Sequence, residues 1–295
     1  MITTTLNFDA ITNEDRGLFD GIQSEVLAQL QQALTTAKGA TGDDKVGQFV
    51  AFLTSYSPDR LDKAGLRPED FTWNTWKVFT YAASCIPPDH PAQDTLVQIL
   101  LALQAAEAPW KDLPEFSMFM RDEWNESPTF AAVDRSASAS DDDQPLSLSE
   151  WINLNSFVAR VFRDVQPSFR TFGIWELRSG LEGDAAKDDE GKPLPQASVD
   201  ARVRVAAEWI TRAGEPLWRD SLLGVWAEET ASTGRAYVGG KLIPATRGLN
   251  LERWGFWKRR FAEVRGDVQE EAARGAVGRA LEVMTALEKK AAEAL

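Results

Sequence analysis

The sequence is poor in the residues that build compact metal and redox sites. Its 295 residues include one cysteine, Cys85, and one histidine, His90. A single cysteine excludes a disulfide framework and zinc sites made of several thiolates. A single histidine excludes motifs that need two, such as H-E-x-x-H. Cys85 and His90 lie close in sequence, so a thiol nucleophile stays open as an alternative, although Pro87 and Pro88 between them are typical of a turn.

Positive charge and long apolar runs are also scarce. The chain has 32 Lys and Arg against 45 Asp and Glu, a net charge of −13, so we expect no nucleic-acid partner, because binding to phosphates needs a basic surface. The most apolar window, residues 95–106, is too short to cross a bilayer. The N-terminal residues 1–17 have neither the positive nor the apolar region of a secretory signal. We therefore expect a cytoplasmic protein with no membrane insertion, and its oligomeric state stays open.

Nucleotide-binding and hydrolase motifs are missing as well. The sequence has no P-loop, no Rossmann fingerprint, no G-x-S-x-G and no Ser-His-Asp pattern. What it has in quantity is aromatic: 11 Trp and 15 Phe in a chain that is 43% hydrophobic. That content is too high for a disordered protein and is ample for a large core.

Apolar residues recur at helical spacing along most of the chain. Trp151, Leu154 and Val158 begin one such stripe, and Ala273 and Val277 begin another in which small residues would allow close helix packing. We predict an all-α fold, a single domain over residues 1–295 of roughly ten to twelve helices. Three polar or Gly-rich stretches are predicted as loops, the first being a candidate joint: 134–149, 182–196 and 229–248.

A few polar residues lie on the apolar sides of these predicted helices. Such a side chain must find a buried partner or line a cavity. Those with this placement are Asp89, Glu123, Asn155, Lys258 and the face formed by Asp220, Ser221, Gly224 and Glu228. Each also has a structural interpretation: Asp89 as a helix N-cap, Glu123 as the partner of a buried arginine, Asn155 as a packing amide, Lys258 lying along Trp254, and the 220–228 face as solvent surface.

Carboxylates, an amide and a lysine among aromatic rings suit one kind of chemistry. Oxygen ligands of this type suit Mg²⁺, which usually bridges carboxylates to substrate phosphates. A lysine adds a point charge for phosphate, and aromatic faces stabilise cations. This combination is what ionisation of a prenyl diphosphate requires. The run 122–126 and the spacing of Asp220, Gly224 and Glu228 are loosely similar to the two metal motifs of all-α terpene synthases.

Five segments together resemble a fungal family long labelled as a domain of unknown function, which includes proteins associated with oxopyrrolidine and other secondary-metabolite clusters. The segments are IPPDHPAQDTLVQIL (86–100), EWINLNSFVARV (150–161), FGIWELRSGLEG (172–183), AAEWITRAG (206–214) and LNLERWGFWKRRFAEV (249–264). A subset of that family comprises atypical humulene-type sesquiterpene cyclases. The resemblance implies an all-helical fold, Mg²⁺, farnesyl diphosphate and a diphosphate-holding lysine on a late helix.

Carried onto this chain, the resemblance predicts a set of site residues. Lys258 is the best match for the lysine, with Lys289 as the rival, and we expect Lys258→Ala to abolish product. Arg253, Trp254 and Trp257 would contact the substrate with Lys258. The candidate metal ligands are Asp89, Asp94, Glu123, Asn155 and Glu228. The alternative function is that of a non-catalytic helical binding or scaffold protein of a fungal biosynthetic cluster, with the basic aromatic helix 251–265 as a partner surface.

Overall fold

The chain is built from α-helices wherever its structure is described. The computed structural model describes residues 6, 8, 21–35, 42–125, 128, 146–188, 191–227 and 237–293. Over these residues it has eleven α-helices, two short 3₁₀ helices and no sheet, with β-type pairing limited to two isolated bridges, Lys187 with Pro193 and Val238 with Arg247. The prediction of an all-α fold with ten to twelve helices is confirmed. In the same residues, no helix combines the length and the apolar character needed to cross a membrane.

Contacts within the chain divide it into two compact units. The first comprises residues 1–128 and 136–157, and the second comprises 129–135 and 158–295. The boundary between Phe157 and Val158 falls inside helix α8 (Leu148–Asp164) and not in the predicted joint, of which only residues 146–149 are described. Two compact units can be lobes of one domain, so the single domain over 1–295 stays a prediction.

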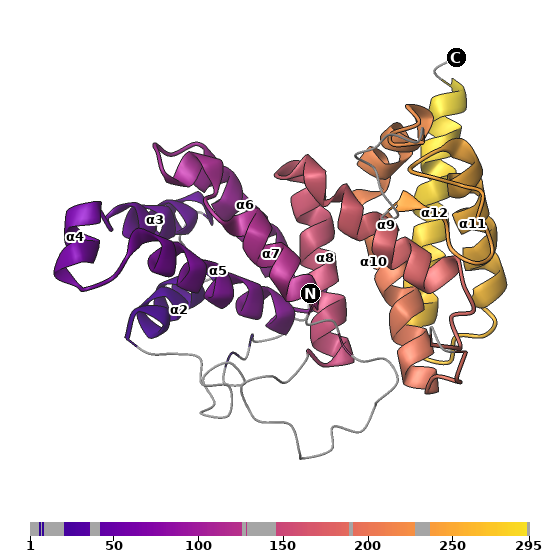
Figure 1. Ribbon diagram of the computed structural model, residues 1–295, viewed down its shortest axis with the longest axis horizontal. Helices are drawn as coiled ribbons and strands as arrows, with labels where there is room; N and C mark the ends of the chain where they lie inside the picture. Colours follow the sequence, from indigo (N-terminus) through magenta and orange to yellow (C-terminus); the bar gives the residue numbers. More distant parts are fainter. Residues whose placement is uncertain are drawn as a thin grey trace. The chain divides into compact units, whose positions relative to one another are not determined.

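The first unit holds helices α2 to α7 and the beginning of α8. Helix α2 packs against α3 and α5, α3 packs against α6, and α5 packs against α7 (Figure 1). Trp76 of α5 is fully buried, and its ring lies 4.8 to 6.2 Å from the rings of three other aromatic residues, Phe79, Trp110 and Phe116. The helices are α2 (Gly21–Leu34), α3 (Gly42–Thr54), α4 (Pro58–Lys63), α5 (Pro68–Cys85), α6 (Ala92–Gln104), α7 (Phe116–Asn125) and the 3₁₀ helix Trp110–Asp112.

Tyr56, between α3 and α4, gives this unit a pH-dependent contact. Its hydroxyl donates to Oε2 of Glu25 at 2.7 Å, and its ring stacks on Phe71 with centroids 4.6 Å apart. Burial, followed by the hydrogen bond to Glu25 and the charge of that carboxylate, raises the pKa of Tyr56 to about 12.

This raised pKa predicts a loss of stability at alkaline pH. The folded state favours the neutral phenol, so its stabilising contribution is complete below the unfolded pKa near 10 and is lost as pH rises towards 12. Urea unfolding at several values between pH 9 and 11 should show a steeper fall for the wild type than for Tyr56→Phe. Glu25→Gln should bring the pKa of Tyr56 back towards 10. Parallel curves for the wild type and Tyr56→Phe would contradict the assignment.

The second unit packs its helices around α10. Helix α10 (Gln196–Leu222) contacts α9 (Arg170–Leu181), α11 (Leu251–Val264) and α12 (Glu271–Glu293), and α10 and α12 run side by side (Figure 1). Small residues permit this closeness, because a Cβ added at Gly214 of α10 would lie 2.8 Å from Val283 of α12. The small-residue stripe predicted for the last helix, beginning at Ala273, is buried as expected.

Helix α10 bends in its second half, where Pro216 lies inside the helix. Proline lacks an N–H and its ring clashes with the carbonyl four residues earlier. The backbone leaves helical geometry at Ala213 (φ −130°, ψ 23°). The carbonyl of Arg212, which Pro216 cannot bond, accepts from Nη1 of Arg163 at 3.4 Å. A side chain of α8 therefore supplies the hydrogen bond that the proline removes.

Candidate functional site

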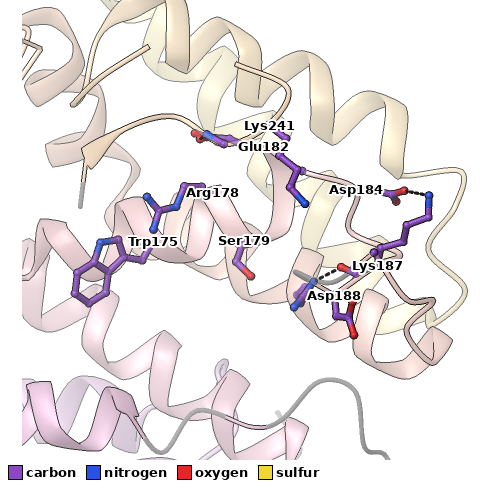
Figure 2. Close-up of a pocket in the computed structure, with 12 residues that line it drawn as sticks. Trp175, Arg178, Ser179, Glu182, Asp184, Lys187, Asp188 and Lys241 are labelled. Atoms are coloured by element: carbon purple, nitrogen blue, oxygen red, sulfur yellow. Dashed lines mark hydrogen bonds and ion pairs between the residues drawn. The ribbon is translucent and has the colours of Figure 1, made fainter. Parts of the chain in front are cut away.

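A cavity of about 630 Å³ lies in the second unit between α9, the first half of α10 and two loops (Figure 2). The loops are residues 182–195, after α9, and residues 237–249, before α11. We call this cavity the cationic pocket. It is lined by Trp175, Arg178, Ser179, Glu182, Gly183, Asp184, Lys187, Asp188, Gly191, Arg202, Gly240 and Lys241.

Basic side chains dominate the charge of this pocket. Four line it, Arg178, Lys187, Arg202 and Lys241, against three carboxylates. One of those carboxylates, Glu182, is fully buried and already paired with Arg253 beneath the pocket. Because Arg253 neutralises Glu182, four positive side chains face two negative ones in the pocket. The chain as a whole has a net charge of −13. A local reversal of charge in a cleft favours an anionic ligand.

The two arginines also hold the walls of the pocket together. Arg178, on α9, donates from Nη1 to the carbonyl of Val238 at 3.2 Å, and Arg202, on α10, donates from Nη1 to the carbonyl of Lys187 at 3.0 Å. Each arginine therefore ties a helix to one of the loops. Lys241 extends from the loop opposite α9 towards the α9 side (Figure 2). Cations from two helices and two loops meet at one cavity.

Asp184 and Asp188 supply the remaining negative charge of the pocket. Asp184 accepts from Nζ of Lys187 at 2.9 Å, and this hydrogen bond is the main reason that the pKa of Asp184 lies below its ordinary value. Asp188 accepts from the backbone N–H of Lys192 at 2.7 Å. Both carboxylates thus take part in the fold of the 182–195 loop while lining the cavity.

Glu182 forms the floor of the pocket. Its Oε1 accepts from Nε of Arg253 and from Nε1 of Trp257, both at 2.6 Å, and its Oε2 accepts from Nη2 of Arg253 at 2.9 Å and from the N–H of Gly240 at 2.7 Å. Four donors satisfy one buried carboxylate, as a charge inside a protein requires. Such a saturated carboxylate is suited to holding structure and not to moving protons.

The structure gives Arg253 the same kind of role. Its side chain is fully buried, and besides Glu182 it donates from Nη1 to the carbonyls of Tyr237 at 3.0 Å and Gly248 at 2.7 Å. Trp254 and Trp257 are 1% and 0% exposed and belong to the core. These three predicted substrate contacts do not line the cationic pocket, and the donors of Arg253 are used within the protein.

Lys258, the predicted diphosphate clamp, lies elsewhere in the same unit. It is half-buried on α11, and its Nζ forms an ion pair with Oε2 of Glu288 on α12. The other oxygen of Glu288 accepts from Nε1 of Trp254 at 2.9 Å. The rival, Lys289, pairs at 3.7 Å with Glu293. Neither lysine lines the cationic pocket, so the lysine clamp stays a prediction to be tested against Lys241.

The predicted metal ligands that are described lie in the first unit. Asp89 and Asp94 are exposed just before and within the first turn of α6, and Glu123 is half-buried on α7. Asn155 is fully buried on α8 and donates from Nδ2 to the carbonyl of Trp151 at 3.0 Å, as a packing amide does. Glu228 lies outside the described residues. Within the described chain, no group of three or more Asp, Glu, His or Cys side chains could hold a metal ion.

Two structural interpretations of these residues need correction. The N-cap of α6 is Pro91 and not Asp89, and the N–H of Ala92 at the start of the helix donates to Nδ1 of His90 at 3.1 Å. The beginning of the 220–228 face is not solvent surface, and Glu228 at its end lies outside the described residues. Asp220 and Ser221 are each 2% exposed, and Asp220 pairs with Arg170 at 3.3 Å.

The two lysines of the cationic pocket were not among the predicted site residues. A polar residue on the apolar side of a helix was the signal for a site, whereas Lys187 and Lys241 lie in segments predicted as surface loops. The available signal was the Gly239-Gly240 pair directly before Lys241, since paired glycines mark a place where backbone approaches backbone.

One comparison with known proteins finds a family. A family model described as a protein of unknown function (DUF3632) matches residues 76–261. This range is more than half of the chain, so the chain belongs to that family, and it includes every residue that lines the cationic pocket. No curated protein and no solved structure matches the chain.

Proposed function

We propose that this member of the DUF3632 family binds a prenyl diphosphate with its diphosphate group in the cationic pocket, and that it is a Mg²⁺-dependent terpene cyclase acting on farnesyl diphosphate. The observation that carries the proposal is the convergence of Arg178, Lys187, Arg202 and Lys241 on one cavity of a strongly acidic chain. The sesquiterpene product, of humulene type, comes from the family resemblance.

The chemistry of the pocket suits a diphosphate. Arginine presents a planar fork that matches two phosphate oxygens at once, whereas lysine provides a mobile point charge. Two residues of each kind line the cavity. A diphosphate has oxygens on two phosphorus atoms and can engage both kinds of donor. This match favours a diphosphate over a ligand with a single carboxylate.

An aromatic residue accompanies the charges. Trp175 lines the pocket one turn before Arg178 on α9, and its ring meets that of Phe172 edge-on with centroids 5.8 Å apart. An indole face can contact an isoprenoid chain or stabilise a carbocation through its quadrupole. Trp175 and Arg178 both belong to FGIWELRSGLEG (172–183), one of the five segments that carry the family resemblance.

Two carboxylates of the pocket fit a magnesium ion in their donor type. Mg²⁺ is commonly held by one or two carboxylates together with substrate phosphate oxygens. Asp184 and Asp188 line the pocket and would supply those ligands, in place of the set predicted from the sequence. When bound, Mg²⁺ would draw charge from the departing diphosphate. The basic side chains would bind and orient the same group.

The decisive test is an activity assay that compares two lysines. Purified protein with Mg²⁺ and farnesyl diphosphate is expected to yield a volatile sesquiterpene, measured by gas chromatography, and EDTA is expected to stop it. Lys241→Met should raise KM about tenfold or more, because a hydrogen bond to a charged group contributes about 1.5–3 kcal/mol. Lys111→Met, an exposed lysine of the first unit, is the matched control and should leave KM unchanged.

The same assay distinguishes the competing assignments. If Lys258→Ala abolishes product while Lys241→Met behaves like Lys111→Met, the diphosphate site lies at Lys258 and not in the cationic pocket. If the wild type binds farnesyl diphosphate in calorimetry but forms no product, the protein is the non-catalytic binding protein of the alternative hypothesis. Absence of both binding and product would overturn the proposal.

A further inference from the structure

We propose that Glu182 is a positioning residue that sets the place of Lys241 in the cationic pocket, so that anion affinity there depends on the buried ion pair between Glu182 and Arg253. The inference rests on the proposed function insofar as it takes the pocket to be an anion site. It adds the residue that organises this site from beneath.

The first observation is that Glu182 holds the backbone on both sides of Lys241. The N–H of Gly240 donates to Oε2 of Glu182 at 2.7 Å, and the N–H of Leu242 donates to the main-chain oxygen of Glu182 at 2.9 Å. The residue before the lysine and the residue after it are thus attached to the same glutamate. Lys241 projects from a short segment whose two neighbouring amides are fixed.

The second observation is that the glutamate cannot easily move. Its carboxylate is fully buried and receives two hydrogen bonds from Arg253, at 2.6 and 2.9 Å, and one from Trp257 at 2.6 Å. Charge-assisted bonds of this kind are short and strong. Both donors lie on α11, so the helix fixes the glutamate and the glutamate fixes the loop.

The third observation is that Arg253 also closes the loop at its base. Nη1 of Arg253 donates to the carbonyls of Tyr237 and Gly248, and the N–H of Gly248 donates to the carbonyl of Tyr237 at 2.9 Å. The loop is therefore fastened at both ends by the partner of Glu182. Between these ends, the amides beside Lys241 are bonded to Glu182 itself.

The approach of loop and glutamate is close enough to require glycine. A Cβ added at Gly240 would lie 2.5 Å from the main-chain oxygen of Glu182 and 2.7 Å from its Cβ, which no side chain could occupy without displacing the loop. A Cβ added at Gly47 of α3, which does not line the pocket, would meet nothing within 4 Å. These two glycines make a matched pair of sites for alanine.

Fixing the backbone of a lysine matters because its side chain is flexible. Ordering a mobile side chain on binding costs free energy, and a backbone held in place reduces what must still be ordered. Loss of the Glu182 contacts should therefore remove the contribution of Lys241 to anion binding while the other three cations keep theirs. A general loss of folding would instead weaken all four together.

The experiment is a double-mutant cycle read by calorimetric titration with inorganic diphosphate at fixed ionic strength. Gly240→Ala and Lys241→Met should each weaken binding about tenfold, and the double variant should bind no more weakly than either one, because both remove the same contact. Gly47→Ala should stay within about twofold of the wild type. Gly240→Ala combined with Lys187→Met should instead weaken binding about a hundredfold, since those changes act independently.

Two further results keep the inference separate from the proposed function. Hydrogen exchange should show protected amides at Gly240 and Leu242 in the wild type and in Gly47→Ala, and faster exchange in Glu182→Gln. Glu208→Gln, which changes another fully buried and ion-paired carboxylate of this unit, should leave those two amides protected.

Independent effects of Gly240→Ala and Lys241→Met on affinity would overturn the positioning role. A wild type that binds no diphosphate would overturn the anion site itself, whatever the exchange data show.

Discussion

Replacing Arg253 with methionine is expected to lower the free energy of unfolding by about 3–5 kcal/mol, the usual cost of breaking a buried ion pair from one side. The substitution would leave the carboxylate of Glu182 buried with no cation beside it. It would also remove the donor shared by the carbonyls of Tyr237 and Gly248. Urea unfolding followed by tryptophan fluorescence measures the effect.

A neighbouring arginine on the same helix provides the control for this prediction. Arg259 is exposed on α11, so Arg259→Met should change the free energy of unfolding by no more than about 0.5 kcal/mol. Combining Arg253→Met with Glu182→Leu should recover part of the lost stability, because an apolar pair of similar size avoids the cost of burying charge. A loss below about 1 kcal/mol for Arg253→Met alone would show that the pair is not needed for folding.

Trp209→Ala is expected to destabilise the protein by about 3–5 kcal/mol, the range for truncating a fully buried tryptophan. Trp209 of α10 is completely buried, and its ring lies 6.3 Å from that of Phe162. Its indole fills the space beneath Gly173 of α9, where an added Cβ would lie 2.8 Å from the ring. The indole lies between α9 and α10, so its removal would leave a cavity between these two helices.

The matched comparison for Trp209 is Trp175 on α9. Trp175 is only half-buried at the cationic pocket, so Trp175→Ala should cost about 1–2 kcal/mol, since less apolar area is returned to water. Both variants are measured by the same urea unfolding. Equal costs for the two tryptophans would mean that the α9–α10 contact does not depend on the indole of Trp209.

The helices were predictable because their signal is local. One buried face repeats every 3.6 residues, so the stripe that begins at Trp151 marks α8 without knowledge of any partner, and Trp151, Leu154 and Val158 are indeed buried. The same pattern did not predict which residues are buried on the opposite face of α8. Ser156 and Arg160, which the same periodicity places opposite that stripe, are 0% and 3% exposed, so polar residues are buried on that side of the helix as well.

The charged residues of helix α11 show where local patterns stop. The sequence places Lys258 on the aromatic side of this helix, and Arg253 was predicted as a substrate contact beside it. It does not indicate that Lys258 meets Glu288, 30 positions later, or that Arg253 meets Glu182, 71 positions earlier. Whether a buried charged side chain is structural or can bind a ligand depends on whether it forms an ion pair within the protein. Ion pairs between residues so far apart in the sequence leave no periodic pattern in it.

By itself the sequence determined the all-α architecture and the acidic character of the chain, since helical periodicity and composition depend on nearby residues or on none. Only the tertiary structure decided which cations face an open cavity and which are used inside the protein. The cationic pocket depends on two loops that meet at the C-terminal end of α9, and Lys241 joins it because Gly240 can lie directly against Glu182. Contacts such as that of Gly240 with Glu182 arise from three-dimensional packing, so they cannot be predicted from either segment of the sequence alone.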